Sequence, residues 1–179
     1  MLNSNGFYLK GSLMALLLAL AGCNDAGSDR QVYEPVAFHS GDECHVCGMA
    51  IGDFPGPKGE AVGKQGAMKF CSTAELFGWW LQPENRGQDI TLYVHDMARS
   101  TWEKPHDDAL IDARQAFYVV GANLKGAMGA ALASFAREED AKAFAAKQGG
   151  RLVRFGQIDL ALLQPESHQA ESHGGPAAH

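Results

Sequence analysis

The stretch CHVCGMAI, residues 44–51, gathers two cysteines, a histidine and a methionine within six positions. Cys47-Gly48-Met49 places a thiol and a thioether two residues apart, and the glycine allows the backbone turn that lets both sulfurs face one ion. Thiolate and thioether sulfur together select copper(I) among the common metal ions. The spacing therefore favours a copper(I) site that uses Cys47 and Met49.

Three other interpretations of Cys44 and Cys47 stay open. A structural zinc site would need a second pair of ligands, and the chain has no second C-x-x-C motif. A thioredoxin-like dithiol should open a helix, whereas Gly48 and a loop rich in glycine and proline follow here. A structural disulfide between the two cysteines requires nothing further.

Further candidate metal ligands lie within this motif and elsewhere in the chain. Met128 stands in the sequence GAMGA between two glycines, a flexible setting that is unsuited to burying an apolar side chain, which favours a functional role. His45 can supply a nitrogen ligand from within the motif, and Cys71 offers another thiol further along the chain. Three histidines near the C-terminus are expected to be solvated.

The first 22 residues are expected to be an export signal. A single Lys10 precedes the apolar run 13–21, which is too short to span a bilayer comfortably. The following Leu20-Ala21-Gly22-Cys23 resembles the lipobox of bacterial lipoproteins, which implies that Cys23 is acylated and anchors the chain. Asn24 after it favours the outer membrane, so we expect a lipid-anchored protein that faces the periplasm.

The remaining chain is long enough for one compact domain, and its pattern predicts strands and helices in a repeated order. Two apolar stretches around Lys64-Gln65-Gly66 predict a hairpin, and Ser72-Thr73-Ala74-Glu75 is a capping box that opens a helix. Alternating apolar residues predict a strand over 89–97. The first half of the domain therefore reads as β-β-α-β.

The same order recurs over two strand-like runs in 116–136, a helix over 137–150 and a strand over 151–158. Phe70 and Phe135 correspond when the halves are aligned 65 residues apart. We expect an α+β fold of two small β-β-α-β units packed together. The predicted segments are a signal peptide (1–22), a flexible membrane tether (23–43), the first half (44–105), the second half (106–160) and a disordered histidine-containing tail (161–179).

Composition and the lack of certain motifs argue against several classes of function. The net charge of −6 and the lack of a long basic run argue against nucleic-acid binding. The chain has no glycine-rich phosphate loop and no G-x-S-x-G nucleophile motif. We therefore expect a monomeric binding protein rather than an enzyme.

Several motifs together resemble the NosL family of accessory lipoproteins for nitrous oxide reductase. The resemblance covers residues 44–160 and rests on CGM, YVHDM, TWEKP, LIDARQAFYVVG, GAMG and AKAFAAKQGGRLVRF. It implies a copper(I) chaperone whose partners are apo nitrous oxide reductase and a membrane transporter complex that handles copper. The family fold is similar to part of the organomercurial lyases.

The resemblance also implies a ligand set. The family pattern keeps the cysteine and methionine of C-G-M and the methionine of G-x-M-G, which are Cys47, Met49 and Met128 here. His45, Cys44 and Cys71 are possible auxiliary ligands. The alternatives are a lipoprotein interaction module with a Cys44–Cys47 disulfide and a periplasmic thiol-disulfide oxidoreductase.

Overall fold

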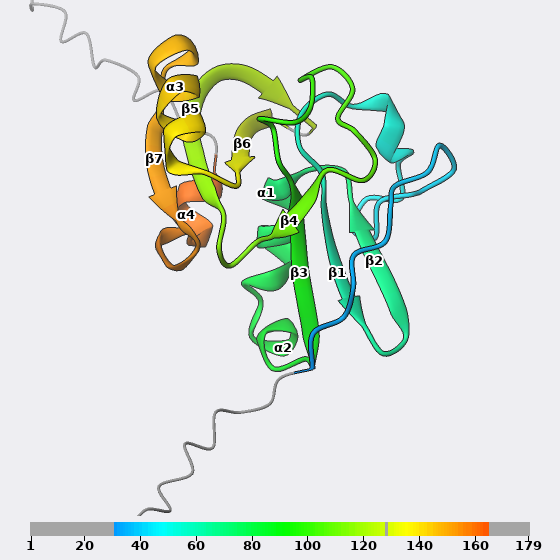
Figure 1. Ribbon diagram of the computed structural model, residues 1–179. Helices are drawn as coiled ribbons and strands as arrows, with labels where there is room; N and C mark the ends of the chain where they lie inside the picture. The colour runs from blue at the N-terminus through cyan, green and yellow to red at the C-terminus, as the bar shows by residue number, and fades with distance from the viewer. Residues whose placement is uncertain (1–30, 128, 165–179) are drawn as a thin grey trace, which may run out of the picture. The chain divides into compact units, whose positions relative to one another are not determined.

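The structure is a computed structural model that describes residues 31–127 and 129–164 (Figure 1). The predicted signal peptide, the lipidation site Cys23, the candidate ligand Met128 and the predicted tail beyond residue 164 lie outside the described residues. The described chain contains helices and two antiparallel sheets, so the prediction of an α+β fold is confirmed. The elements are η1 (Ile51–Asp53), β1 (Gly59–Gly63), β2 (Gly66–Phe70), α1 (Thr73–Trp80), α2 (Pro83–Arg86), β3 (Ile90–His95), β4 (Leu110–Asp112), β5 (Phe117–Gly126), β6 (Gly129–Phe135), α3 (Glu138–Gln148), β7 (Arg151–Arg154), η2 (Phe155–Gln157) and α4 (Leu160–Leu163).

The first sheet has the strand order β2-β1-β3-β4, and each neighbouring pair is antiparallel. Ala61 in the central strand β1 lies opposite Met68 on one side and Leu92 on the other. The predicted hairpin is confirmed, and its turn ends at Gly66, whose φ of 114° is a conformation that favours glycine. β1 and β3 carry fully buried side chains, so this sheet forms one wall of the main core.

The second sheet has the order β6-β5-β7 and is also antiparallel. In both halves the first strand is central, the second and third flank it, and the helix lies between the second and third in sequence. β2 ends at Phe70 and β6 at Phe135, which is the correspondence that the aligned sequences predict. The boundary between the halves differs from the prediction, because 110–112 pair with β3 and so belong to the first sheet.

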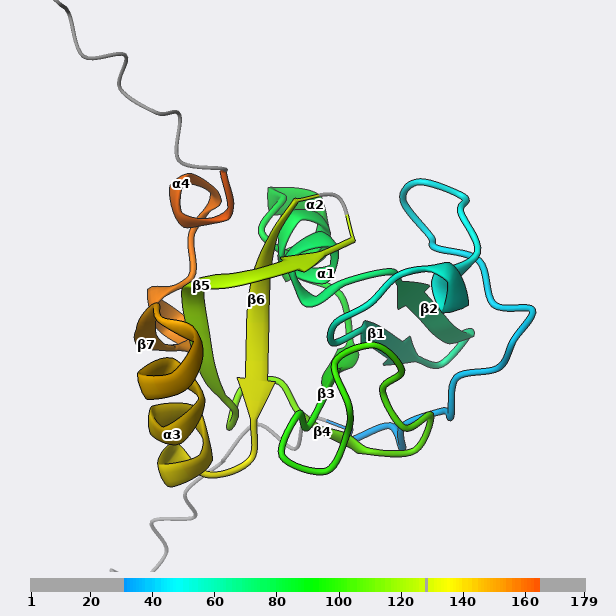
Figure 2. The ribbon, with the colours of Figure 1, turned by 90° about the horizontal axis from the view of Figure 1, so that it is seen from above.

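Helix α1 connects the two sheets. Ser72 caps it by accepting a hydrogen bond from the Glu75 backbone N–H at 3.0 Å, as the capping-box pattern predicts. The helix packs against β1 and against β6 (Figure 2). At its first turn the buried Thr73 hydroxyl donates a hydrogen bond to the Leu132 carbonyl oxygen of β6. The helix that follows the cysteine-bearing strand therefore also fixes the second half of the domain.

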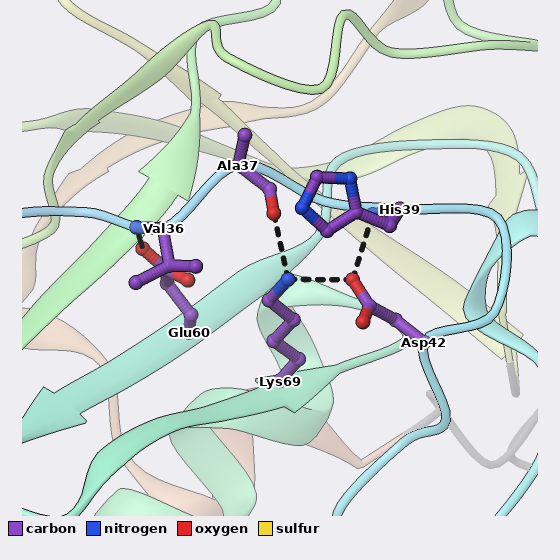
Figure 3. A network of polar contacts seen from close by, with 6 residues as sticks. All are labelled: Val36, Ala37, His39, Asp42, Glu60 and Lys69. Atoms are coloured by element: carbon purple, nitrogen blue, oxygen red, sulfur yellow. Dashed lines mark hydrogen bonds and ion pairs between the residues drawn. The ribbon is translucent and has the colours of Figure 1, made fainter.

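The segment 31–43 is part of the fold, so the prediction of a flexible tether through residue 43 is wrong over these residues. The Val36 backbone N–H donates to Glu60 of β1 at 2.8 Å (Figure 3). The Tyr93 hydroxyl donates to the Tyr33 carbonyl oxygen at 2.6 Å. Phe38 is 4% exposed and packs against the His95 ring with centroids 5.0 Å apart. The sequence does not indicate that this segment packs on the domain, because the segment is polar and turn-rich and Phe38 is its only large buried side chain.

The C-terminal boundary also differs from the prediction. Residues 160–163 form α4, a short helix capped by Asp159, which accepts from the Leu162 backbone N–H. Leu162 and Leu163 pack against the main core, so the ordered chain extends past residue 160. Over residues 31–127 and 129–164, no helix has the length and apolar character needed to cross a membrane.

Candidate metal site

The loop that carries the C-x-x-C-G-M motif folds into a tight turn. The Cys44 backbone N–H donates to the Met49 carbonyl oxygen at 2.9 Å, and the Gly48 N–H donates to the Cys44 carbonyl oxygen at 2.8 Å. Gly48 has a φ of 69°, which is the backbone freedom that the sequence assigns to it. An isolated bridge between Glu43 and Ala50 closes the base of the turn.

Contacts with β2 hold this turn at the end of the first sheet. The His45 backbone N–H donates to the Lys69 carbonyl oxygen at 2.8 Å. The Lys69 ammonium, on a side chain only 9% exposed, pairs with Asp42 at 2.5 Å and donates to the Ala37 carbonyl oxygen at 2.7 Å (Figure 3). The Asp42 carbonyl oxygen in turn accepts from the Ile51 N–H at 3.0 Å. One buried cation therefore ties the segment before the cysteines to the sheet, and the backbone bond between Ile51 and Asp42 joins the end of the loop to its start.

This anchoring brings three thiols together. The sulfur atoms of Cys44, Cys47 and Cys71 lie within 4.8 Å of one another, and those of Cys47 and Cys71 are 3.9 Å apart. Cys44 and Cys71 are 3% and 0% exposed, whereas Cys47 is half-buried. All three are free thiols, so the disulfide weighed for Cys44 and Cys47 is not seen. Cys44 and Cys71 are therefore shielded from solvent, whereas Cys47 can be approached from it.

The environment distinguishes two of the three thiols. At Cys44, burial alone would raise the pKa, but the backbone N–H groups of Cys47, Cys71 and Val46 outweigh it, so the pKa is lowered. At Cys71, burial raises the pKa strongly, and the neighbouring Cys44 thiolate raises it further. Cys44 therefore ionises more readily than Cys71.

A buried lysine lies near the cluster. Lys58 is 4% exposed, and its ammonium donates to the carbonyl oxygens of Phe54 and Pro55 at 2.5 and 3.2 Å. Burial lowers the pKa of Lys58 to about 8, and the electrostatic influence of Cys71 opposes this shift. A cation in this position favours negative charge on the Cys71 thiol.

The other candidate donors are placed differently. His45 is exposed, and its ring packs edge-on against Trp79 and Phe70 with centroids 6.0 and 5.8 Å away, so no described contact joins it to the cluster. Met49 is half-buried in the turn beside Cys47. Met128 lies outside the described residues, but the preceding Ala127 is 2% exposed and belongs to the main core.

The sequence gives Cys71 only an auxiliary role, and the structure brings it to the centre of the cluster. Its position depends on the pairing of the 44–51 turn with the end of β2, between segments about 25 residues apart in sequence. The one local signal is that Cys71 follows a strand that ends in the core with Phe70. Strand alternation predicts the face of a side chain and not which loop will cover it.

The fold and the thiol cluster define a small α+β protein with a candidate soft-metal site. The sequence matches the NosL family over residues 35–163, and the chain belongs to that family. It is 63% identical over 171 residues to the "Copper-binding lipoprotein NosL" of Stutzerimonas stutzeri, covering 94% of this chain and 89% of the relative. It is 34% identical over 127 residues to the protein of the same description from Achromobacter cycloclastes, covering 68% and 66%.

A solved structure agrees with this assignment. The crystal structure of the copper chaperone NosL from Shewanella denitrificans is similar with a TM-score of 0.68 and 46% sequence identity. The similarity covers 72% of this chain and 97% of that protein. The similarity of the described fold to part of the organomercurial lyases stays a prediction.

Proposed function

We propose that this protein is a copper(I)-binding chaperone of the periplasm, anchored by lipid at Cys23. The observation that carries the proposal is the meeting of three free thiols within 4.8 Å, one of them approachable from solvent. Soft sulfur donors select copper(I) over the harder divalent ions. The names of the relatives, which describe copper binding and a copper chaperone, support the same ion.

The spacing of the sulfurs suits a single ion. Thiolates bind zinc at about 2.3 Å, and three sulfurs at that distance around one ion would be about 4 Å apart. The 3.9 Å separation of Cys47 and Cys71 is already of this size. Cys47, Met49 and Met128 are the proposed first ligands. The grouping of Cys44 and Cys71 with Cys47 within 4.8 Å supports a role for these two thiols as further donors.

The burial pattern suits transfer as well as binding. Two of the thiols are buried, and the half-buried Cys47 leaves one side of the cluster open to solvent. A ligand from a receiving protein can approach on that side before the old ligands leave. The ion is then transferred to the receiving protein without being released into solution.

Anaerobic titration with a copper(I) chelator tests the binding. The unchanged protein should bind one copper(I) per chain, Cys47→Ser should lose this binding, and Met128→Leu should weaken it. Met97→Leu is the matched control, since Met97 is 9% exposed in the second core and belongs to no candidate site. If Cys47→Ser retained the affinity of the unchanged protein, the site would lie elsewhere.

The same titration, combined with an assay of disulfide turnover, separates the competing functions. An interaction module would bind no copper, and a thiol-disulfide oxidoreductase would turn over a disulfide substrate. The structure gives the oxidoreductase no support, because residues 45–47 form a turn and not the first turn of a helix that would activate a thiolate.

We propose apo nitrous oxide reductase as the recipient and a membrane copper transporter complex as the donor. Mixing the copper-loaded protein with the apo enzyme should move copper into the enzyme faster than equimolar copper from a chelator of matched affinity. Equal rates from the two sources would argue against a dedicated transfer. Cys23→Ser should release the protein from the membrane fraction while leaving its copper affinity unchanged, which separates anchoring from binding.

A further inference from the structure

Lys58 carries a buried positive charge that no carboxylate balances. Its side chain is 4% exposed, and its ammonium donates to the backbone oxygens of Phe54 and Pro55 at 2.5 and 3.2 Å. Within the part of the chain that the structure describes, no Asp or Glu forms an ion pair with it. The other buried lysine, Lys69, has Asp42 as its partner at 2.5 Å. A buried charge is costly unless an opposite charge compensates it, so a negative group beside Lys58 would be stabilised.

The strand register places Lys58 opposite Cys71. Lys58 immediately precedes β1, and Cys71 immediately follows β2. Gly59 lies opposite Phe70 in this antiparallel pair, so the next pair along is Lys58 with Cys71. Residues that lie opposite each other in such a pair present their side chains on the same face, with Cβ atoms about 5 Å apart. The charge of Cys71 raises the pKa of Lys58 against the effect of burial, which agrees with this proximity. The lysine therefore lies beside the cysteine cluster.

Backbone hydrogen bonds on both sides hold Lys58 in this place. Its N–H donates to Nδ1 of the buried His95 at 3.0 Å, and the His95 N–H donates to the Lys58 carbonyl oxygen at 3.1 Å. On the other side, the N–H of the buried Thr73 donates to the Pro57 carbonyl oxygen at 3.1 Å. The backbone at Lys58 is therefore fixed between the end of β3 and the start of α1.

Copper(I) binding makes the thiol cluster negative. Cysteine binds a metal ion as the thiolate, so each thiol that joins the ion releases one proton. The three thiols of the cluster contribute three negative charges, which leave a net charge of −2 around copper(I) and of −1 around a divalent ion. Methionine ligands are neutral and change neither sum. A nearby cation therefore stabilises the copper(I) complex more than the complex of a divalent ion, because the interaction energy scales with the product of the charges.

We propose that Lys58 supplies the counter-charge of the copper(I)–thiolate cluster and so favours copper(I) over divalent ions at this site. The proposal rests on the proposed function, in which the cysteine cluster binds copper(I). Lys58 makes no bond to the ion, and its ammonium acts through space from its position opposite Cys71. This role gives a buried cation, whose two hydrogen-bond acceptors are neutral carbonyl oxygens, a negative partner in the loaded protein.

A comparison of two metal ions tests the proposal. Lys58→Met removes the charge and keeps an unbranched side chain. In anaerobic chelator competition, we expect its copper(I) affinity to fall about tenfold and its zinc(II) affinity about threefold, because the zinc complex carries half the negative charge. Lys58→Arg keeps a cation and should recover most of the copper(I) affinity. Lys142→Met is the matched control, since it removes one positive charge from an exposed side chain of α3, and it should leave both affinities unchanged.

The outcomes separate the proposal from the proposed function. Equal losses of copper(I) and zinc(II) affinity in Lys58→Met would overturn the proposal, because a purely structural change acts on both ions alike. Unchanged copper(I) affinity would also overturn it, while the copper site would stand. No copper(I) binding by the unchanged protein would remove the proposed function and this proposal with it. Urea unfolding of the metal-free proteins checks that each variant is folded. Lys58→Gln, which keeps hydrogen-bond donors on the side chain, takes the place of Lys58→Met if that variant does not fold.

Discussion

Cys47 and Cys71 bring their sulfur atoms to 3.9 Å although 24 positions separate them in the sequence. Cys47 belongs to a turn that contains Gly48, and Cys71 directly follows the buried end of β2. The ion pair of Lys69 with Asp42 and the backbone bond from His45 to Lys69 hold the two segments together. The metal site is therefore a product of the fold and not of the local motif alone.

The buried thiol is expected to contribute to copper affinity. Cys71→Ala removes a donor that is 0% exposed, and we expect copper(I) affinity to fall at least tenfold, which is about 1.4 kcal/mol. The neighbouring Ser72→Ala is the control. It removes the α1 cap and should lower the free energy of unfolding by about 1 kcal/mol without changing copper affinity. Equal copper affinity in Cys71→Ala and the unchanged protein would exclude Cys71 from the site.

The Lys69 anchor is expected to matter for both stability and binding. Lys69→Met leaves the Asp42 carboxylate without its cation, and we expect the free energy of unfolding in urea to fall by about 1–3 kcal/mol. Copper affinity should fall as well, because the 42–51 turn loses a tie to β2. Adding Asp42→Asn should restore part of the stability by removing the unpaired charge. Unchanged values for Lys69→Met would show that the turn is held without this contact.

Much of the fold could be predicted from the sequence where local signals are strong. The capping box at Ser72, the hairpin turn before Gly66 and the apolar alternation of β3 each fix an element within its own segment. The docking of 31–43 could not be predicted, because it depends on single tertiary contacts of Val36 and Phe38 with distant strands.

The candidate site was predictable only in part, for the same reason. Cys47 and Met49 share one turn whose glycine is visible in the sequence. The approach of Cys71 requires the pairing of that turn with β2, which no local pattern encodes.

Glu60 predicts a pH dependence of stability. Its carboxyl group is 0% exposed with one oxygen unpaired, and burial raises its pKa to about 7, against the opposing effects of the Val36 N–H and Lys69. The unfolded carboxyl ionises near pH 4.5, so between about 4.5 and 7 the folded state binds more protons. The stability that this group contributes is complete below pH 4.5 and is lost as the pH rises toward 7.

The Glu60→Gln variant isolates this effect. Urea unfolding from pH 4.5 to 7 should show the unchanged protein losing stability relative to the variant, by at most about 1.4 kcal/mol per pH unit. Other groups, including the buried His95, titrate in both proteins and cancel in the difference. A difference that stays constant with pH would show that Glu60 has an ordinary pKa in the fold.

Two glycines near α1 predict opposite effects of the same substitution. A Cβ on Gly59 would lie 2.6 Å from a methyl carbon of Leu76, so Gly59→Ala should lower the free energy of unfolding by about 1–3 kcal/mol. Gly78 lies inside α1 with nothing within 4 Å of such a Cβ, so Gly78→Ala should raise it by about 0.5–1 kcal/mol. Thermal unfolding would reveal the difference in sign. Similar shifts for both variants would contradict the close packing of α1 on β1.

X-ray absorption at the copper K edge tests the central claim most directly, because it reports the atoms bound to the ion. The copper(I)-loaded protein should show a first shell made of sulfur, and Cys47→Ser should lose that shell or the copper itself. The cluster of three thiols within 4.8 Å predicts this result. A first shell of nitrogen or oxygen alone in the unchanged protein would contradict the assignment of copper to the cysteine cluster.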